Sequence, residues 1–189
     1  MKKIVVFASG SGTNAENIIK YFAETKIGNV VAVFTNRSDA KVIERAKNYQ
    51  VPVVVFSKDD LIESKILQKI NTFRPDLIVL AGFLLKFPHN IIEAYPDKII
   101  NIHPALLPKY GGKGMYGMNI HRTIVENKEK ETGITIHFVN ENYDEGNIIF
   151  QNKIVLNGDE TPEQIAEKIH ELEQEHFPQI IEKLLTPKP

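Results

Sequence analysis

An amide and an imidazole stand two positions apart in this chain, at Asn101 and His103. The apolar run Lys98–Ile102 predicts a β-strand, in which every second side chain points to the same face. Asn101 and His103 therefore share a face, while Ile102 points into the packing. Such a pair could stabilise an oxyanion and move a proton. From the pattern alone, a capping asparagine and an ordinary surface histidine explain the pair equally well.

The glycine-rich turn Ser9-Gly10-Ser11-Gly12-Thr13-Asn14 is a second candidate site. It follows the expected strand Ile4–Ala8 and precedes the expected helix Ala15–Ala23. Glycine lets backbone N–H groups converge, and the helix start adds partial positive charge, so the turn suits a single phosphate monoester. The Gly-Lys-Ser/Thr ending of a Walker A loop and the third glycine of a dinucleotide-binding loop are missing. A tight turn without a ligand remains the alternative.

Asp144 lies in the polar loop Glu141–Gly146, after an apolar strand. Acidic residues in such loops usually serve turn formation, so Asp144 gains a chemical role only if it approaches His103. His137 alternates with apolar neighbours on a strand and is interpreted as structural support. We expect no metal site, because the other histidines on predicted helices lack the spacing of metal ligands: His121, His170 and His176.

Strand and helix alternate five times in the first hundred residues, which predicts an α/β fold with a Rossmann-like, mostly parallel twisted sheet and helices on both faces. The other expected strands are Val30–Thr35, Val51–Phe56 and Asp76–Ala81, and the other expected helices are Lys41–Tyr49, Asp59 or Asp60 to Phe73, and Pro88–Ala94. Ligands bind at the carboxyl ends of strands in such sheets, and that is where Asn101 and His103 stand.

After His103 the chain changes character. A loop rich in proline and glycine, residues 104–118, leads to a helix, then to two strands, and then to a terminal helix with proline in its first turn. The expected bounds are helix Asn119–Asn127, strands Gly133–Val139 and Ile148–Leu156, and a last helix starting at Thr161-Pro162-Glu163.

The composition is that of an ordinary globular protein, with 42% hydrophobic and 25% charged residues and a net charge of −1. This balance gives no general attraction to nucleic acid or to an anionic membrane. The chain has no cysteine, so disulfides and thiolate chemistry are excluded, which fits the cytoplasm. The apolar run near the amino terminus is too short for a secretory signal.

Four segments resemble the folate-dependent formyltransferases: Ser9–Asn14, Leu80–Phe83, Asn101–Tyr110 and Asp144–Gly146. The stretch NIHPALLPKY is specific to that superfamily, and the glycine-rich opening is typical of its glycinamide ribonucleotide formyltransferases. The resemblance runs from the first strand to about Pro178. It implies the formyltransferase fold in a single domain, residues 1–189, with a phosphate-binding α/β half (1–103) and a folate-binding and C-terminal helical part (104–189).

The resemblance also implies a reaction, in which the amine of glycinamide ribonucleotide takes the formyl group of 10-formyltetrahydrofolate during purine synthesis, without a metal. Asn101 and protonated His103 would hold the oxyanion, while Asp144 would raise the pKa of His103 and assist proton transfer. The implied binding residues are Gly12, Thr13 and Asn14 for the phosphate, Glu175 for the ribose or glycinamide, and Leu84, Leu85, Lys86, Phe87, Asn140, Glu141, Asn142 and Tyr143 for the folate.

The partners implied are small molecules, with no nucleic acid or membrane, and the chain would be a monomer or a weak homodimer. It departs from the family pattern in three places. Residues 109–118 form a longer loop with four glycines, which we interpret as a flap over the site. Asn119 replaces a frequent histidine, and a frequent arginine near Leu84–Phe87 is missing, so that Lys86 or Lys58 would meet the glutamate tail of folate.

Other functions compete with this interpretation. A methionyl-tRNA formyltransferase would need a second, basic domain, and a formyltetrahydrofolate hydrolase usually has a regulatory domain before the first strand. Sugar-nucleotide formyltransferases share the Asn-x-His pattern but lack this phosphate loop. A module that binds a nucleotide or phosphate without catalysis is the alternative from a different class, and an activity assay separates it from an enzyme.

Overall fold

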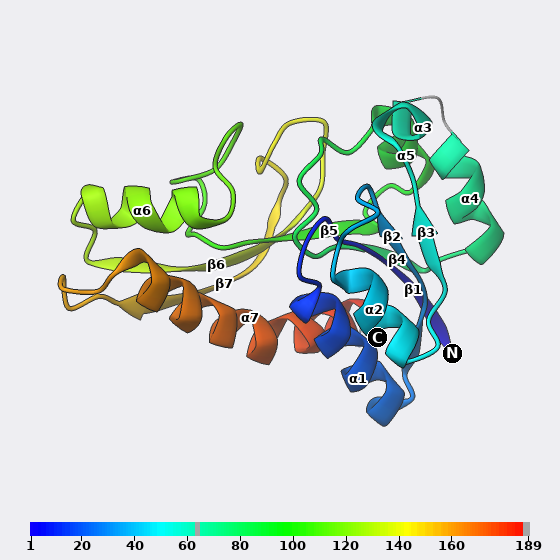
Figure 1. The fold of residues 1–189 in the computed structure, drawn as a ribbon, viewed down its shortest axis with the longest axis horizontal. Helices are drawn as coiled ribbons and strands as arrows, with labels where there is room; N and C mark the ends of the chain where they lie inside the picture. The colour runs from blue at the N-terminus through cyan, green and yellow to red at the C-terminus, as the bar shows by residue number, and fades with distance from the viewer. Residues whose placement is uncertain (63–64, 187–189) are drawn as a thin grey trace.

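The computed structural model describes residues 1–62 and 65–186 and is organised around one continuous seven-stranded sheet (Figure 1). The strands lie in the order β3-β2-β1-β4-β5-β6-β7. Neighbours among β1 to β5 are parallel, whereas β6 runs antiparallel to β5 and to β7. The bounds are β1 Lys2–Phe7, β2 Gly28–Thr35, β3 Val53–Val55, β4 Leu77–Leu80, β5 Ile99–His103, β6 Glu131–Phe138 and β7 Ile148–Val155. The mostly parallel α/β sheet expected from the sequence is confirmed.

Helices cover both faces of this sheet. The described helices are α1 Thr13–Thr25, α2 Val42–Asn48, α3 Lys58–Ile62, α4 Lys65–Phe73, α5 His89–Ala94, α6 Met118–Glu126 and α7 Pro162–Leu185. One core cluster contains side chains of α1, α2, α6 and α7, and a second contains side chains of α3, α4 and α5. The expected helix from Asp59 or Asp60 to Phe73 corresponds to α3 and α4, and residues 63–64 lie outside the described residues.

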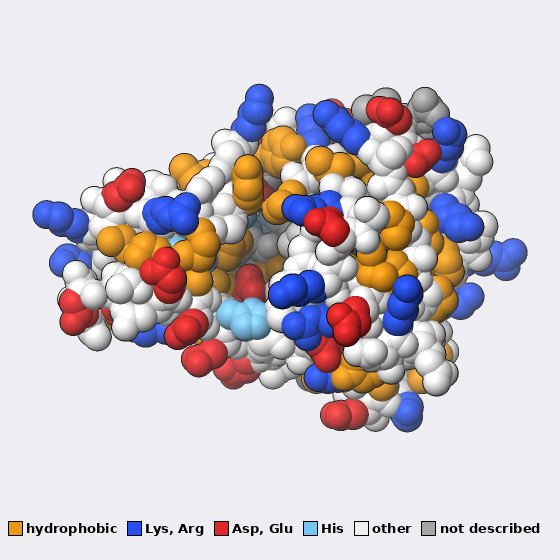
Figure 2. All heavy atoms as spheres, viewed as in Figure 1, with side chains coloured by type: hydrophobic (Ala, Val, Ile, Leu, Met, Phe, Trp, Pro, Cys, Tyr) orange, Lys and Arg blue, Asp and Glu red, His pale blue; other side chains and the backbone are white. Residues whose placement is uncertain are grey.

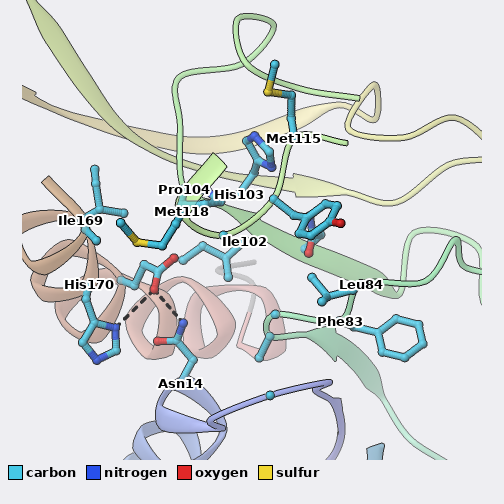
Figure 3. Close-up of a pocket in the computed structure, with 18 of the residues that line it drawn as sticks. Asn14, Phe83, Leu84, Ile102, His103, Pro104, Met115, Met118, Ile169 and His170 are labelled. Carbon is cyan, nitrogen blue, oxygen red and sulfur yellow. Dashed lines mark hydrogen bonds and ion pairs between the residues drawn. The ribbon is translucent and has the colours of Figure 1, made fainter. Parts of the chain in front are cut away.

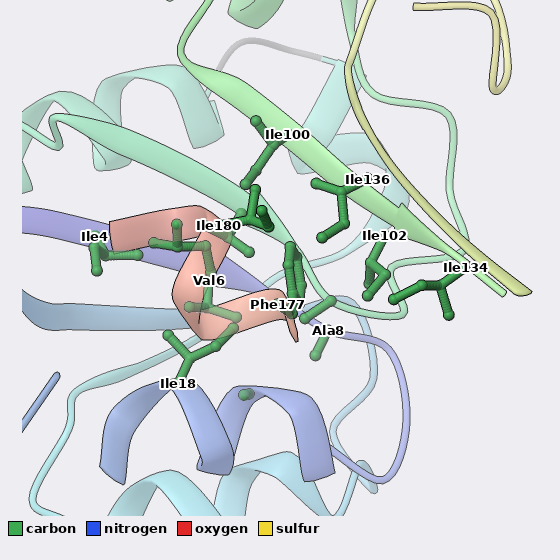
Figure 4. Close-up of a cluster of buried hydrophobic side chains, with 14 of the residues drawn as sticks. Ile4, Val6, Ala8, Ile18, Ile100, Ile102, Ile134, Ile136, Phe177 and Ile180 are labelled. Atoms are coloured by element: carbon green, nitrogen blue, oxygen red, sulfur yellow. The ribbon is translucent and has the colours of Figure 1, made fainter. Parts of the chain in front are cut away.

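The two clusters lie on opposite faces because side chains alternate along each strand. On β5, Ile100 and Ile102 belong to the larger cluster, and Ile99 belongs to the smaller one. Figure 4 shows Ile102 among the isoleucines of β6, near Phe177 of α7. Ile102 is buried as expected from the sequence. Its anchoring fixes the direction in which the neighbouring side chains of β5 point.

Five phenylalanines fill the smaller cluster and hold the chain that follows β4. Phe7 of β1 contacts the ring of Phe83 at a centroid distance of 5.4 Å and that of Phe87 at 5.1 Å. Phe34 stacks on Phe7 at 4.8 Å, and Phe56 completes the group. Edge-to-face and offset-stacked rings are favoured arrangements in protein cores. Segment 83–87 is thereby fixed beside the carboxyl end of β5.

Helix α7, the last helix of the chain, is bonded to α1, the first. It begins at Thr161 with a capping box formed with Gln164, and Pro162 occupies its first turn as expected. Asn17 of α1 donates to the backbone oxygen of Gln174 at 2.8 Å, which ties the first helix to the last. Within the described part of the chain, no helix combines the length and apolar character needed to cross a bilayer.

Candidate active site

Asn101 and His103 close strand β5 on one face, as the sequence predicted. The register pairs Asn101 with His137 of β6 and His103 with Thr135. His137 therefore reaches the site through the antiparallel pairing of β5 with β6, which local sequence does not specify. His103 and His137 are almost completely buried, at 4% and 2% exposure. The end of β5 thus presents one amide and two enclosed imidazoles.

His103 is held between a backbone carbonyl and a carboxylate. Its Nε2 lies 2.8 Å from the carbonyl oxygen of Tyr110, and because a carbonyl only accepts, Nε2 carries the hydrogen. Its Nδ1 lies 3.6 Å from Oδ2 of Asp144. Burial lowers the pKa of His103 and outweighs the opposite effect of Asp144 and Tyr110. Asp144 acts in the expected direction, since its charge raises the pKa of His103, but burial has the larger effect and keeps the pKa below its ordinary value, which favours the neutral ring.

Asp144 is the carboxylate that sequence pattern alone would have discarded. It lies in the loop between β6 and β7 with a positive φ of 57°, and its Oδ2 accepts from the N–H of Gly112 at 2.9 Å. Its Oδ1 lies 3.6 Å from Nε2 of His137. Burial favours the neutral acid, but His137, His103 and the Gly112 N–H outweigh it and lower the pKa of Asp144. The side chain is therefore a carboxylate in contact with two histidines.

The orientation of Asn101 follows from its hydrogen bond with His137. Nδ1 of His137 lies 2.8 Å from the carbonyl oxygen of Phe138, which only accepts, so Nδ1 carries a hydrogen. Its Nε2 then accepts, and Nδ2 of Asn101 donates to it at 3.1 Å. The amide nitrogen has a second hydrogen, which remains as a donor for a ligand. The same contact fixes the amide plane.

Asn101, His103 and Asp144 line a large cleft with a volume of about 610 Å³. Figure 2 shows the surface hollowed between two parts of the molecule, with hydrophobic side chains around the hollow. The glycine-rich turn, Gly10 to Asn14, lies at one end, and Asn101, His103 and Asp144 also line the cleft. In Figure 3, Asn14 of α1 and His170 of α7 point toward the same carboxylate, that of Glu173. The glycine-rich turn and the candidate catalytic side chains therefore line the same cavity.

A second, smaller pocket of about 60 Å³ adjoins the cleft. Its lining combines apolar residues with amides and comes from the chain after β4 and from the loop after β6: Leu80, Phe83, Leu85, Lys86, Phe87, Asn101, His137, Val139, Asn140, Asn142, Tyr143 and Asp144. Asn101 and Asp144 line both cavities. A ligand in the cleft and a ligand in the small pocket would thus meet at these two side chains.

The sequence matches the formyl transferase family over residues 2–181. This chain belongs to the formyl transferase family. It is 36% identical to the phosphoribosylglycinamide formyltransferase of Bacillus subtilis (strain 168), over 98% of this chain and 95% of the relative. The crystal structure of glycinamide ribonucleotide transformylase 1 from Geobacillus kaustophilus matches with a TM-score of 0.90 at 36% identity, covering 98% of this chain and all of that one.

Plant relatives of this chain are longer. The chloroplastic phosphoribosylglycinamide formyltransferase of Arabidopsis thaliana is 38% identical over 93% of this chain, which spans 62% of that protein. The corresponding protein of Vigna unguiculata is 34% identical over 97% of this chain, which spans 61% of that protein. The chain therefore covers about three fifths of the plant relatives it matches.

Two of the expected binding residues point elsewhere. Glu175 lies outside the cleft lining, with its side chain 64% exposed and its Oε2 3.9 Å from Nε2 of His176. Glu141 lies outside both pockets and contacts His89 at 2.8 Å. The other expected binding residues line one or both cavities. Lys86 lines the small pocket, whereas Lys58 lines neither.

Three polar residues of the cleft were not assigned to a site from the sequence, namely His121, His170 and Glu173. His121 is only 5% exposed, and its Nδ1 has no hydrogen-bond partner among the described residues. Glu173 accepts from Asn14 at 2.9 Å and raises the pKa of His170 through a contact of 3.4 Å. The signal for Glu173 was available, because it lies four residues after the buried Ile169 on the same face of a helix.

Proposed function

We propose that this formyl transferase transfers the formyl group of 10-formyltetrahydrofolate to the amine of glycinamide ribonucleotide, a step of purine synthesis. The names of the bacterial relatives and of the solved neighbours support this choice of acceptor. The observation that carries it is the position of Asn101 and Asp144 where the cleft with the glycine-rich turn meets the small pocket, with His103 beside them in the cleft. One cavity would take the phosphorylated acceptor, and the other would take the formyl donor.

The acceptor would lie along the cleft with its phosphate at the glycine-rich turn. Backbone N–H groups of Gly12 and Thr13, the start of α1 and the Asn14 amide are suitable phosphate partners. The carboxylate of Glu173 would accept from hydroxyl groups of the ribose, in the role expected of Glu175. His121, whose Nδ1 is buried without a partner, would contact the same substrate.

The donor would place its heteroaromatic rings in the small pocket. The lining alternates apolar walls, such as Leu85 and Val139, with the amides of Asn140 and Asn142, which suits a flat ring with polar edges. Lys86, also in this lining, would meet an anionic part of the donor. Leu84, which was also expected to contact the folate, lies in the wall of the cleft, where it is 48% exposed. No metal enters the proposed reaction.

The chemistry then divides among three side chains. The acceptor amine attacks the formyl carbon, a new C–N bond forms, and the carbonyl oxygen becomes an oxyanion. Asn101 would donate its free N–H to that oxyanion, as donors in oxyanion holes do. Neutral His103 would take the proton that the amine loses, and would return it to the departing nitrogen of the folate as the old C–N bond breaks. Asp144 would stabilise the transient imidazolium from 3.6 Å.

An absorbance assay for tetrahydrofolate release tests this function. We expect release that depends on added glycinamide ribonucleotide, and no release when that acceptor is omitted. Release without an acceptor would indicate a hydrolase, and formylation of methionyl-tRNA alone would indicate the tRNA-modifying branch of the family. His103→Ala is the matched negative control, because it removes the proposed base at the end of β5. Absence of any acceptor-dependent signal in the unaltered protein would refute the proposal.

A further inference from the structure

Helix α2 holds the glycine-rich turn from outside the cleft. Arg45 donates from Nε to the carbonyl oxygen of Ser11 at 2.9 Å, and the N–H of Val42 donates to the carbonyl oxygen of Gly10 at 3.2 Å. Two successive carbonyls of the turn are therefore bound by two residues of one helix. Neither Arg45 nor Val42 lines the cleft as the structure describes it.

These two bonds determine where the N–H groups of the turn point. The Gly10–Ser11 and Ser11–Gly12 peptides are trans, so each N–H points opposite to the carbonyl of the same peptide unit. With both carbonyls directed at α2, the N–H groups of Ser11 and Gly12 are directed away from it, on the side where these residues line the cleft. Neither N–H has a hydrogen-bond partner among the described residues.

The turn also packs closely against α2 at Gly12. This residue has a φ of +75°, and a Cβ built on it would lie 2.4 Å from Cγ2 of Val42. A side chain at this position would push the turn away from the helix. The close approach of Gly12 to Val42 and the bond from Arg45 to Ser11 therefore both hold the turn in place against α2.

The positive charge of Arg45 is paired with a neighbouring carboxylate. Its guanidinium pairs with Glu16 of α1, which also contacts Lys20 at 3.1 Å and the hydroxyl of Tyr49 at 3.2 Å. An arginine that served as a phosphate ligand would direct its fork of donors at the anion. Here Nε donates to a carbonyl and Nη1 donates to a carboxylate, so Arg45 acts on the turn and not on the ligand.

We propose that Arg45 is a positioning residue for phosphate recognition, which orients the N–H groups of Ser11 and Gly12 toward the phosphate by binding the Ser11 carbonyl. This inference rests on the proposed function, because it assumes that the turn holds the acceptor's phosphate. It assigns a role in substrate affinity to a residue that does not contact the substrate.

The test compares Arg45→Ala with the unaltered protein, using glycinamide ribonucleotide and its dephosphorylated form, glycinamide riboside. Loss of one hydrogen bond to a charged group should raise KM for the ribonucleotide roughly tenfold, with kcat within about twofold. For the riboside, kcat/KM should be the same in both proteins. Arg45→Lys, which keeps one donor and the charge, should recover part of the affinity. Arg74→Ala is the control, since Arg74 is exposed in the turn before β4, at the opposite end of the strands.

A binding measurement separates this inference from the proposed function. Titration with ribose 5-phosphate should give weaker binding to Arg45→Ala than to Arg74→Ala, even if the protein formylates a different acceptor. Equal affinity in the two variants would overturn the role of Arg45. Equal losses of kcat/KM with the ribonucleotide and the riboside would also overturn it, because a general structural defect does not distinguish the two acceptors. If Arg45→Ala does not fold, Arg45→Lys and Arg45→Gln carry the same comparisons.

Discussion

Asn14 and Glu173 are bonded across 159 positions of sequence, with Nδ2 of Asn14 donating to Oε2 of Glu173 at 2.9 Å. Gln174 donates to the other end of the same amide at 2.7 Å. The first residues of α1 are therefore oriented by the middle of α7. The contact between His170 and Glu173 also goes to Oε2, which leaves Oε1 without a partner among the described residues. That oxygen is available to a hydroxyl group of the acceptor.

Glu173→Gln should therefore weaken acceptor binding. An amide cannot accept as strongly as a carboxylate, and we expect KM for glycinamide ribonucleotide to rise about tenfold. Steady-state kinetics at saturating folate measures this change. Glu175→Gln is the matched control, because the Glu175 side chain is 64% exposed and lies outside the cleft. Equal effects of the two substitutions would contradict the placement of the acceptor along α7.

The helical period explains why Glu173 and not Glu175 faces the cleft. Ile165 and Ile169 mark the buried face of α7, and Glu173 continues that series at a spacing of four. Glu175 lies two positions further, which turns it by about 200° around the helix. The motif resemblance implied Glu175, whereas the helical period of the same segment predicts that Glu173 faces the cleft. What periodicity does not supply is the contact with Asn14, because that depends on how α7 packs on α1.

Asn101→Ala should reduce turnover much more than binding. The substitution removes the proposed donor to the oxyanion, and loss of such a donor typically lowers kcat by roughly a hundred- to a thousandfold. KM for both substrates should change by less than about threefold, because the donor acts mainly in the transition state. Asn157→Ala, at an exposed position after β7, serves as the control. A variant with near-normal kcat would remove Asn101 from the mechanism.

The protonation of His103 gives a pH-dependent prediction. Burial holds its pKa below the usual 6.5, so the neutral base is lost, and kcat/KM falls, only as the pH drops below that value. Because the negative charge of Asp144 raises this pKa, Asp144→Asn should lower it further. NMR titration of the His103 ring measures both values without the need for activity. Asp159→Asn should leave the titration unchanged, and an upward shift in Asp144→Asn would contradict the electrostatic relation.

The same pair has a consequence for stability. Asp144 has a pKa below its ordinary value in the folded protein, so the stability it contributes is present above the unfolded pKa of about 3.9 and is lost as the pH falls through the folded value. Thermal unfolding of Asp144→Asn should therefore depend less on pH below about 4 than that of the unaltered protein. Identical pH dependence in the two proteins would indicate that Asp144 is not charged in this contact.

The position of Asp144 is the feature that sequence could not supply. Local pattern interprets an acid in a polar loop as solvated, and the resemblance supplied its role without a geometry. In the structure its approach to His103 depends on a positive φ at Asp144 and on the antiparallel pairing of β6 with β5. It also depends on Gly146, where a Cβ would lie 1.7 Å from the carbonyl oxygen of Phe138. Strand pattern predicted the elements, but long-range pairing placed the carboxylate.

Gly146→Ala should accordingly displace the loop that carries Asp144. The added Cβ meets a backbone oxygen and not the end of a flexible side chain, so the chain itself must move. We expect a lower midpoint of thermal unfolding and a kcat reduced about as much as in Asp144→Asn. Glu145→Ala, at the exposed neighbouring position, is the control for a change in the same loop. Normal kcat in Gly146→Ala would show that the loop adapts without moving the carboxylate.

The loop 109–118 is bonded at its base to His103 and Asp144, so its proposed closure can be tested segment by segment. His103 donates to the carbonyl of Tyr110, and Gly112 donates its N–H to Asp144. Residues 113–118 continue along the cleft, and Tyr116 is 52% exposed there. Amide exchange should therefore be slow at Gly112 in the free protein and fast at residues 113–118 except Met115, whose N–H donates to the Gly112 carbonyl oxygen at 3.1 Å. Exchange in this second group should slow when folate and acceptor bind. Unchanged exchange at residues 113–118 on binding would mean that the loop is not a flap. If binding slows this exchange in the unaltered protein but not in Asp144→Asn, the bond from Gly112 to Asp144 anchors the closure.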